Sequence, residues 1–174
     1  YAKAFNDMIL CNMRDMPSPI RSGAIPPGAK DWTPAPSAGI AGGSMWGALG
    51  VGARAGQMWY WYSGVIGSPS FSLDARVALI FNLVDAADYL AVVKGGGNWD
   101  TQINDSLFEL GYTYPELKRS KEFFNRGIDG LVRNSKETVH VDGPLREPSI
   151  NYHGLVTNRF LGLLETAQNL GVDV

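Results

Sequence analysis

Two polar loops in the second half of the chain carry the residues whose types and spacing could do chemistry. The first reads GGGNWDTQ from Gly95, so that Asn98 follows three glycines and precedes a helical pattern. Glycines let the backbone approach a ligand closely, and the N-terminus of the next helix favours an anion. The amide of Asn98 could therefore hydrogen-bond a carboxylate and stabilise the charge left when a neighbouring carbon loses its proton. The commoner use of Asn at such a position is to cap the helix.

The second loop, Asp142–His153, reads DGPLREPSINYH and ends where the last helical pattern begins. A tyrosine hydroxyl can give a proton to a departing oxygen and, as phenolate, take one from carbon, and this suits Tyr152. The alternative for Tyr152 is a core side chain with a satisfied hydroxyl. His153 could act as a base or orient a neighbour, although a lone histidine at a helix start is more often structural. We expect Tyr152 to point into a cleft lined by the loops.

Several further polar residues could bind an anionic ligand. Arg146 and Glu147 could do so or could hold their loop in place, and Arg is the better carboxylate partner because its guanidinium binds in a bidentate way. Gln102 lies one turn after Asn98 and could reach the same cleft. Arg54 is either a buried, paired charge or a carboxylate binder, and it lies in a segment with three tryptophans, Trp46, Trp59 and Trp61.

Composition excludes some classes of protein. The 174 residues carry a net charge of -2, which offers no field for nucleic acid and no polybasic patch for a membrane. The apolar run from Pro34 to Ile66 contains Arg54 and Gln57, which are costly in lipid, so we favour an inner helix of a bundle. Cys11 stands alone and should be buried in an apolar helix. No secretory signal is visible, and the start on Tyr1 suggests an excised piece.

Helical periodicity dominates the chain outside a proline-rich loop over residues 15–36. It predicts a first helix over 1–14, a second over 45–65, a third from residue 73 that ends within 94–97, and a fourth over 100–110. A fifth helix begins at 115 and includes Leu131, a sixth covers 152–170, and a brief extended piece is predicted over 138–141. We expect Ser70 or Ser72 to cap the third helix, with an apolar stripe of Leu73, Val77, Ile80, Val84, Ala87 and Ala91. Gly111 should close the fourth helix, Pro115 should open the fifth, and Gly171 should end the last. The predicted class is all-α, built of antiparallel hairpins.

Other chemistries lack their signatures. The chain has no GxGxxG, no P-loop and no GxSxG elbow. Two histidines and one cysteine give no zinc spacing, so we expect no metal and no other cofactor in this segment. Asp142 and Glu147 could in principle form a glycosidase pair, which would require both carboxylates to converge on one cleft.

The order of these motifs resembles a known family. A glycine-rich loop ending in Asn, then a helix, then D-G-x-x-x-E-x-S-x-x-Y-H resembles the α/α-toroid domain of heparinase II/III-like polysaccharide lyases. Those enzymes cut uronic-acid polysaccharides, such as heparan sulfate and alginate, by β-elimination. A weaker likeness extends over the whole chain through an opening Y-A-x-A-F-x-D helix, a loop near Trp32, an Arg/Trp-rich helix and the G-G-N-W loop.

The resemblance implies roles for individual residues. Asn98 matches the asparagine that neutralises the substrate carboxylate, and Tyr152 matches the catalytic acid or acid/base, with His153 beside it. Several members have His after this Asn, whereas this chain has Trp99, which could instead stack on a sugar ring. Together with the residues considered above, the candidate substrate-binding residues are Trp99, Gln102, Arg146, Glu147 and Arg54.

The resemblance also implies a larger context. Residues 1–174 would form the middle of an incomplete toroid that packs against the rest of that toroid and a C-terminal β-sandwich, with no membrane or nucleic-acid partner. The sandwich supplies another catalytic residue and often a metal, so the segment alone should be incomplete for turnover. The implied location is periplasmic or secreted. The alternatives are a non-catalytic carbohydrate-binding or structural helical domain and a glycoside hydrolase on the same scaffold.

Overall fold

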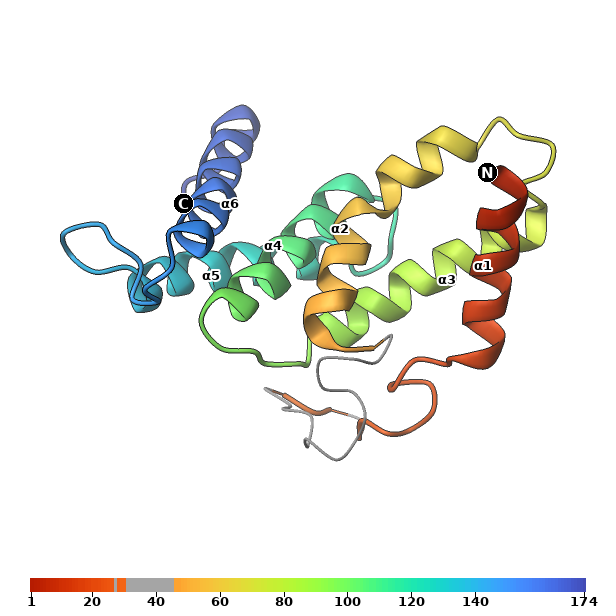
Figure 1. Cartoon of the computed structure of the whole chain (residues 1–174), viewed down its shortest axis with the longest axis horizontal. Coiled ribbons are helices and arrows are strands. Elements are labelled where there is room, and N and C mark those ends of the chain that lie inside the picture. The colour runs from red at the N-terminus through yellow and green to blue at the C-terminus, as the bar shows by residue number, and fades with distance from the viewer. Residues whose placement is uncertain (27, 31–45) are drawn as a thin grey trace. The chain divides into compact units, whose positions relative to one another are not determined.

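The computed structural model describes residues 1–26, 28–30 and 46–174. Within them the chain forms six α-helices: α1 (Ala2–Asp15), α2 (Ala48–Val65), α3 (Leu73–Leu90), α4 (Asn98–Thr113), α5 (Ser120–Thr138) and α6 (Ile150–Leu170) (Figure 1). The extended piece predicted over 138–141 is reduced to a single antiparallel bridge between Val139 and Leu145. The predicted all-α class is confirmed. The predictions near Trp32 and at residue 45 lie outside the described residues.

The chain divides into two compact units, residues 1–93 and 94–174. Among the helices of the described ranges, none combines the length and the apolar composition that a bilayer crossing requires.

In the first unit, α2 and α3 form an antiparallel hairpin. Tyr62 and Phe71 meet edge to face at the end near the connecting loop, with ring centroids 6.0 Å apart. Trp46 and Tyr89 do the same at the other end, 5.8 Å apart. Ser72 rather than Ser70 caps α3, because its Oγ accepts a hydrogen bond from the backbone N–H of Ala75 at 3.2 Å.

The predicted apolar stripe of α3 is only partly buried. Its first members, Leu73, Val77 and Ile80, are 73%, 44% and 55% exposed, whereas Val84 is half-buried and Ala87 and Ala91 are buried. The other buried residues of α3 lie outside the predicted stripe: Ala75, Ala78, Leu79, Asn82, Leu83, Asp85, Ala86, Tyr89 and Leu90. Because α3 is apolar on most of its sides, periodicity alone does not select the packed one. Only the packing of α1 and α2 against α3 selects that face.

The prediction of a buried Cys11 is also wrong. The thiol is exposed, and the Arg14 guanidinium lies 3.8 Å from its sulfur. The buried residue of α1 is Ile9. Cys11 lies two residues further along, which on a helix turns it to a different side.

In the second unit, α4 and α5 form an antiparallel hairpin whose backbones approach closely through glycines. A Cβ added at Gly127 would lie 2.4 Å from the backbone nitrogen of Phe108, and one added at Gly111 would lie 2.4 Å from that of Phe124. At Gly130 it would overlap the Asn104 side chain at 2.2 Å. α6 completes the core, in which Phe108, Leu131 and Leu163 pack with Phe124, Ile128, Val132 and Phe160.

Several helix boundaries in this unit differ from prediction, since α4 and α6 each begin two residues early, at Asn98 and Ile150, and the turn between α4 and α5 lies elsewhere. α4 continues through Gly111 to Thr113, because that glycine makes room for α5 and does not end the helix. Pro115 lies in the connecting turn, and α5 begins only at Ser120. The last boundary is confirmed, since Gly171 ends α6 in the left-handed conformation with φ +65°.

Candidate functional site

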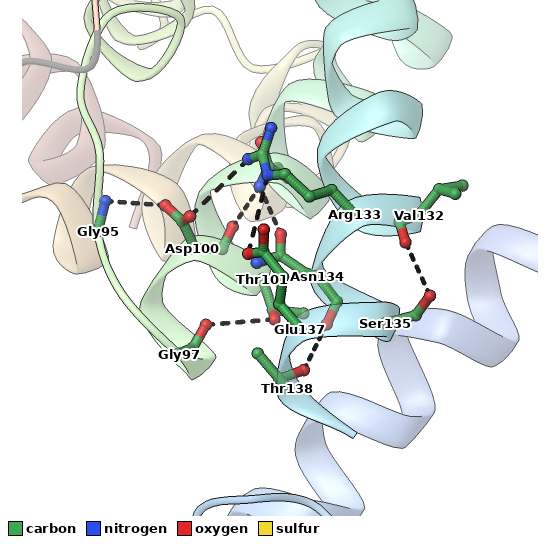
Figure 2. Close-up of polar contacts among 11 residues, drawn as sticks. Gly95, Gly97, Asp100, Thr101, Val132, Arg133, Asn134, Ser135, Glu137 and Thr138 are labelled. Atoms are coloured by element: carbon green, nitrogen blue, oxygen red, sulfur yellow. Dashed lines mark hydrogen bonds and ion pairs between the residues drawn. The ribbon is translucent and has the colours of Figure 1, made fainter. Parts of the chain in front are cut away.

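The glycine-rich loop enters α4 through a turn that needs glycine. Gly97 occupies the N-cap position with φ +54°, a backbone angle that residues with a side chain rarely adopt. Before it, the N–H of Gly95 donates to Oδ1 of Asp100 at 2.8 Å, and this bond is drawn in Figure 2. The buried carboxylate of Asp100 therefore ties the loop back onto the first turn of the helix.

Asn98 is the first residue of α4 and not its cap. Its Nδ2 donates to Oε2 of Glu147 at 2.9 Å, across 49 positions of sequence. The capping alternative therefore does not describe this side chain, because Gly97 holds the cap position. The contact joins the two loops that the sequence singled out.

A cavity of about 280 Å³ opens beside this contact. Asn98 and Glu147 line it, together with two cations, Lys94 and Arg146, and with Asp100. Residues of α5 close the other side: Asn134, Glu137 and Thr138. The lining therefore contains an amide, two cations and carboxylates, so it can hydrogen-bond and partly neutralise an anionic group of a ligand.

Buried polar side chains beside the cavity join α4 to α5. Nδ2 of Asn104 donates to the backbone oxygen of Asp100 at 2.8 Å and to Oδ1 of Asn134 at 2.7 Å. In Figure 2 the Thr138 hydroxyl donates to the backbone oxygen of Asn134, at 2.6 Å, and Arg133 reaches toward Asp100 at 3.9 Å. Neither Asn104 nor Asn134 was predicted from the sequence. The signal that the sequence offered was the four-residue spacing of Asp100 and Asn104, which places both on one side of a helix.

The second loop is fastened at both ends. The N–H of Arg146 donates to the Thr138 oxygen at 2.8 Å, beside the bridge between Val139 and Leu145. The N–H of Leu145 donates to Nδ1 of His153 at 3.3 Å. In this contact the Nδ1 of His153 is the acceptor. His153 thus holds the loop that carries Arg146 and Glu147.

A second, more open cavity of about 600 Å³ lies along this loop and includes His153 in its lining. Leu145 and Glu147 line both cavities. Tyr152 is 46% exposed on the first turn of α6, and its N–H donates to the Ser149 hydroxyl at 3.4 Å. Its side chain lines neither of the two cavities. The expectation that Tyr152 points into a cleft lined by the loops is therefore not met at these two cavities, and its predicted acid or acid/base role stays a prediction.

Two other predicted binding residues, Gln102 and Trp99, do not line the first cavity. Gln102 is buried and turned toward α6, where its Oε1 accepts from Arg159 and its Nε2 donates to Ser106 at 3.0 Å. Arg159 also pairs with Asp105, so this group ties α6 to α4. The expectation that Gln102 reaches the cleft is not met, because these bonds hold it elsewhere. Trp99 is 41% exposed and lines neither cavity.

Arg54 belongs to the first unit. Its guanidinium lies over the ring of Trp46, 5.7 Å from the centroid, and burial lowers its pKa from the ordinary value. Trp61 is 41% exposed, and the side chain of Trp59 lies outside the described residues. The Arg54 side chain is half-buried, and both alternatives, a buried, paired charge and a carboxylate binder, stay predictions.

Within the described ranges, no group of three or more His, Cys, Asp and Glu side chains is placed to hold a metal ion. A family model described as Heparinase II/III N-terminus matches residues 27–174. No curated protein and no solved structure matches the chain.

Proposed function

The chain belongs to the heparinase II/III family, and from that premise we propose that it is part of a polysaccharide lyase. The reaction would be β-elimination on a uronic-acid-containing polysaccharide of the heparin, heparan sulfate or alginate type. The observation that carries the proposal is the cavity in which the amide of Asn98 lies with Lys94 and Arg146. The lining also holds the carboxylates of Asp100, Glu137 and Glu147, and the amide and the two cations are the groups in it that can bind an anionic sugar carboxylate.

In this reaction a base removes the C5 proton of the uronate, the C4–O4 bond breaks and a C4=C5 double bond forms. The electron pair from C5 delocalises into the carboxylate on the way, so a donor at that carboxylate lowers the barrier. Asn98 would supply it through an amide N–H. Tyr152 would give its proton to the departing O4, and the base would be either Tyr152 itself or a residue of another domain.

Neighbouring residues would support these two. Arg146 would pair with the uronate carboxylate, and Trp99, exposed beside Asn98, would stack on a sugar ring. His153 would hold the loop through its bond to Leu145. Ser149 links Tyr152 to this loop, because it accepts from the N–H of Tyr152 and donates its own N–H to the Glu147 oxygen at 2.8 Å.

We also propose that this chain packs within an α/α-toroid and beside a β-sandwich. Large apolar side chains remain exposed on the helices, on α3 as Leu73, Val77, Ile80 and Phe81 and on α6 as Leu155, Leu161 and Leu164. Such rows of apolar residues are typical of surfaces that another element covers. A periplasmic or secreted location is proposed on family membership alone.

Ultraviolet absorbance tests the proposal directly. The protein carrying this chain is incubated with heparan sulfate, hyaluronan, chondroitin and alginate, beside Tyr152→Phe and Asn98→Ala. A lyase makes a 4,5-unsaturated uronate that absorbs in the near ultraviolet, and we expect the signal with one polymer and a large loss in both variants. Sugar binding without absorbance would instead identify a carbohydrate-binding domain. Release of reducing ends without absorbance would identify a glycoside hydrolase.

A further inference from the structure

We infer that Glu147 is a positioning residue, whose carboxylate holds the Asn98 amide in one of its two orientations. This inference rests on the proposed function, in which an N–H of Asn98 meets the substrate carboxylate. The direct observation is the 2.9 Å hydrogen bond from Nδ2 of Asn98 to Oε2 of Glu147. An ionised carboxylate only accepts hydrogen bonds, so it requires the nitrogen of the amide, and not the oxygen, to face it.

That requirement matters because an amide has two ends of opposite polarity. With its nitrogen toward Glu147, Asn98 keeps one further N–H available as a donor. Rotation by 180° would present the carbonyl oxygen in its place, and this oxygen would repel a uronate carboxylate. Glu147 therefore selects the orientation in which Asn98 can stabilise negative charge, before any substrate arrives.

The Glu147 carboxylate can do this because its own backbone is fixed. The oxygen of Glu147 accepts from the N–H of Ser149 at 2.8 Å, and the preceding Arg146 donates to Thr138, also at 2.8 Å. His153 holds Leu145 one residue earlier. A side chain on a loop fastened at three successive points loses little additional entropy when it holds a partner. Through its hydrogen bond, the Glu147 carboxylate then holds the Asn98 amide, and both residues line the same cavity.

The same facts argue against Glu147 as a direct uronate ligand. A carboxylate repels the substrate carboxylate, and one of its oxygens is already engaged by Asn98. The two roles predict different kinetics, because a positioning residue of the charge-stabilising group changes kcat, whereas a direct ligand of the ground state changes KM.

A double-mutant cycle on the polymer that gives absorbance separates the roles. We expect Glu147→Ala to lower kcat up to about 100-fold with KM unchanged, since a misplaced catalytic group costs about that much. Glu147→Gln keeps an acceptor oxygen and should restore part of the rate. In an Asn98→Ala background, Glu147→Ala should cause no further loss. Losses that multiply, or a change in KM alone, would overturn the inference.

Glu165→Gln serves as the matched control, because Glu165 is an exposed carboxylate on α6 outside both cavity linings. It should leave kcat unchanged. Equal unfolding midpoints for the native protein, Glu147→Ala and Glu147→Gln would exclude a loss of folding as the cause of a lower rate. A Glu147→Ala variant with native kcat and KM would contradict the positioning role.

The side-chain amide signal of Asn98 gives a readout that does not depend on turnover. In a ¹⁵N-asparagine-labelled protein the pair of amide protons is assigned by its loss in Asn98→Ala. We expect one of the two protons to resonate downfield and to lose that shift in Glu147→Ala. An unchanged signal overturns the inference, whether or not the protein is a lyase. A shifted signal without product from any polymer means that the proposed function fails while the contact stands.

Discussion

At the scale of the residue, the site depends on a few side chains that are held from two directions. Asp100 holds the backbone of the glycine loop through Gly95, and Glu147 holds the amide of Asn98. Gly97 makes both possible, because its φ of +54° turns the chain into α4 at the cap position. Geometry rather than charge alone therefore places the Asn98 amide in the cavity lining.

A substitution at Gly97 should show how much this turn matters. Gly97→Ala forces a side chain into a conformation that only glycine adopts readily, which should lower the free energy of unfolding by about 1–3 kcal/mol. Gly96→Ala is the control, since its backbone lies outside the left-handed region and no atom lies within 4 Å of an added Cβ. Urea unfolding of both variants measures the difference. Equal midpoints would show that the turn carries no such requirement.

At the scale of the element, the α4–α5 hairpin is the scaffold on which the cavity is built. Its helices approach at glycines and are joined by the buried pair Asn104 and Asn134. Close backbone contact and a specific polar pair together fix how one helix is set along the other. The Asp100 and Thr138 ends of the hairpin then line the cavity.

Gly127→Ala tests the close approach. The new methyl group would lie 2.4 Å from the Phe108 nitrogen, which is a backbone atom and cannot rotate away. We expect a loss of about 1–3 kcal/mol in the free energy of unfolding. Gly162→Ala in α6 meets no atom within 4 Å and should be neutral or stabilise by up to about 1 kcal/mol. Circular dichroism during denaturant unfolding distinguishes them, and similar losses in both would refute the close packing.

Asn134→Ala tests the polar pair. It leaves Asn104 buried without one of its two acceptors, and such a loss costs about 1–3 kcal/mol. Asn104→Ala should cost a similar amount, and the double variant should cost less than the sum of the two, because one interaction is removed twice. Additive losses in chemical denaturation would mean that the two side chains do not act as a pair.

At the scale of the whole molecule, stability depends on pH through buried groups as well as packing. Burial raises the pKa of Tyr89, beside Trp46, to about 12. A raised folded pKa means that the neutral phenol stabilises the fold below its unfolded pKa of about 10, and that this contribution is lost as pH rises toward 12.

Removing that hydroxyl should therefore flatten the alkaline limb of the stability profile. We expect Tyr89→Phe to lose less stability than the native protein between about pH 10 and pH 12. Tyr60→Phe, at an exposed position, should leave the profile unchanged. Thermal unfolding midpoints over this pH range provide the measurement. Parallel profiles for native protein and Tyr89→Phe would place the alkaline transition on another group.

Much of this molecule follows from local chemistry that the sequence displays. Ser72 caps α3, Gly171 ends α6 and apolar periodicity marks the helices, because each is decided by residues within one or two turns. The motif around Asn98 and Tyr152 indicated the family, because a family motif is recognised from the types of its residues and their order along the chain.

The tertiary structure decided the features that depend on contact between distant segments of the chain. Gly111 is a residue that often ends a helix, but here it lies inside α4 and leaves room for the backbone of α5. α3 is apolar on most of its sides, and it buries the side that contacts α1 and α2. Gln102 accepts a hydrogen bond from Arg159, and Asn98 donates one to Glu147, which lies 49 positions later in the sequence. No local pattern encodes such contacts. They form because the packing of the hairpin and the fastening of a distant loop bring those side chains within reach.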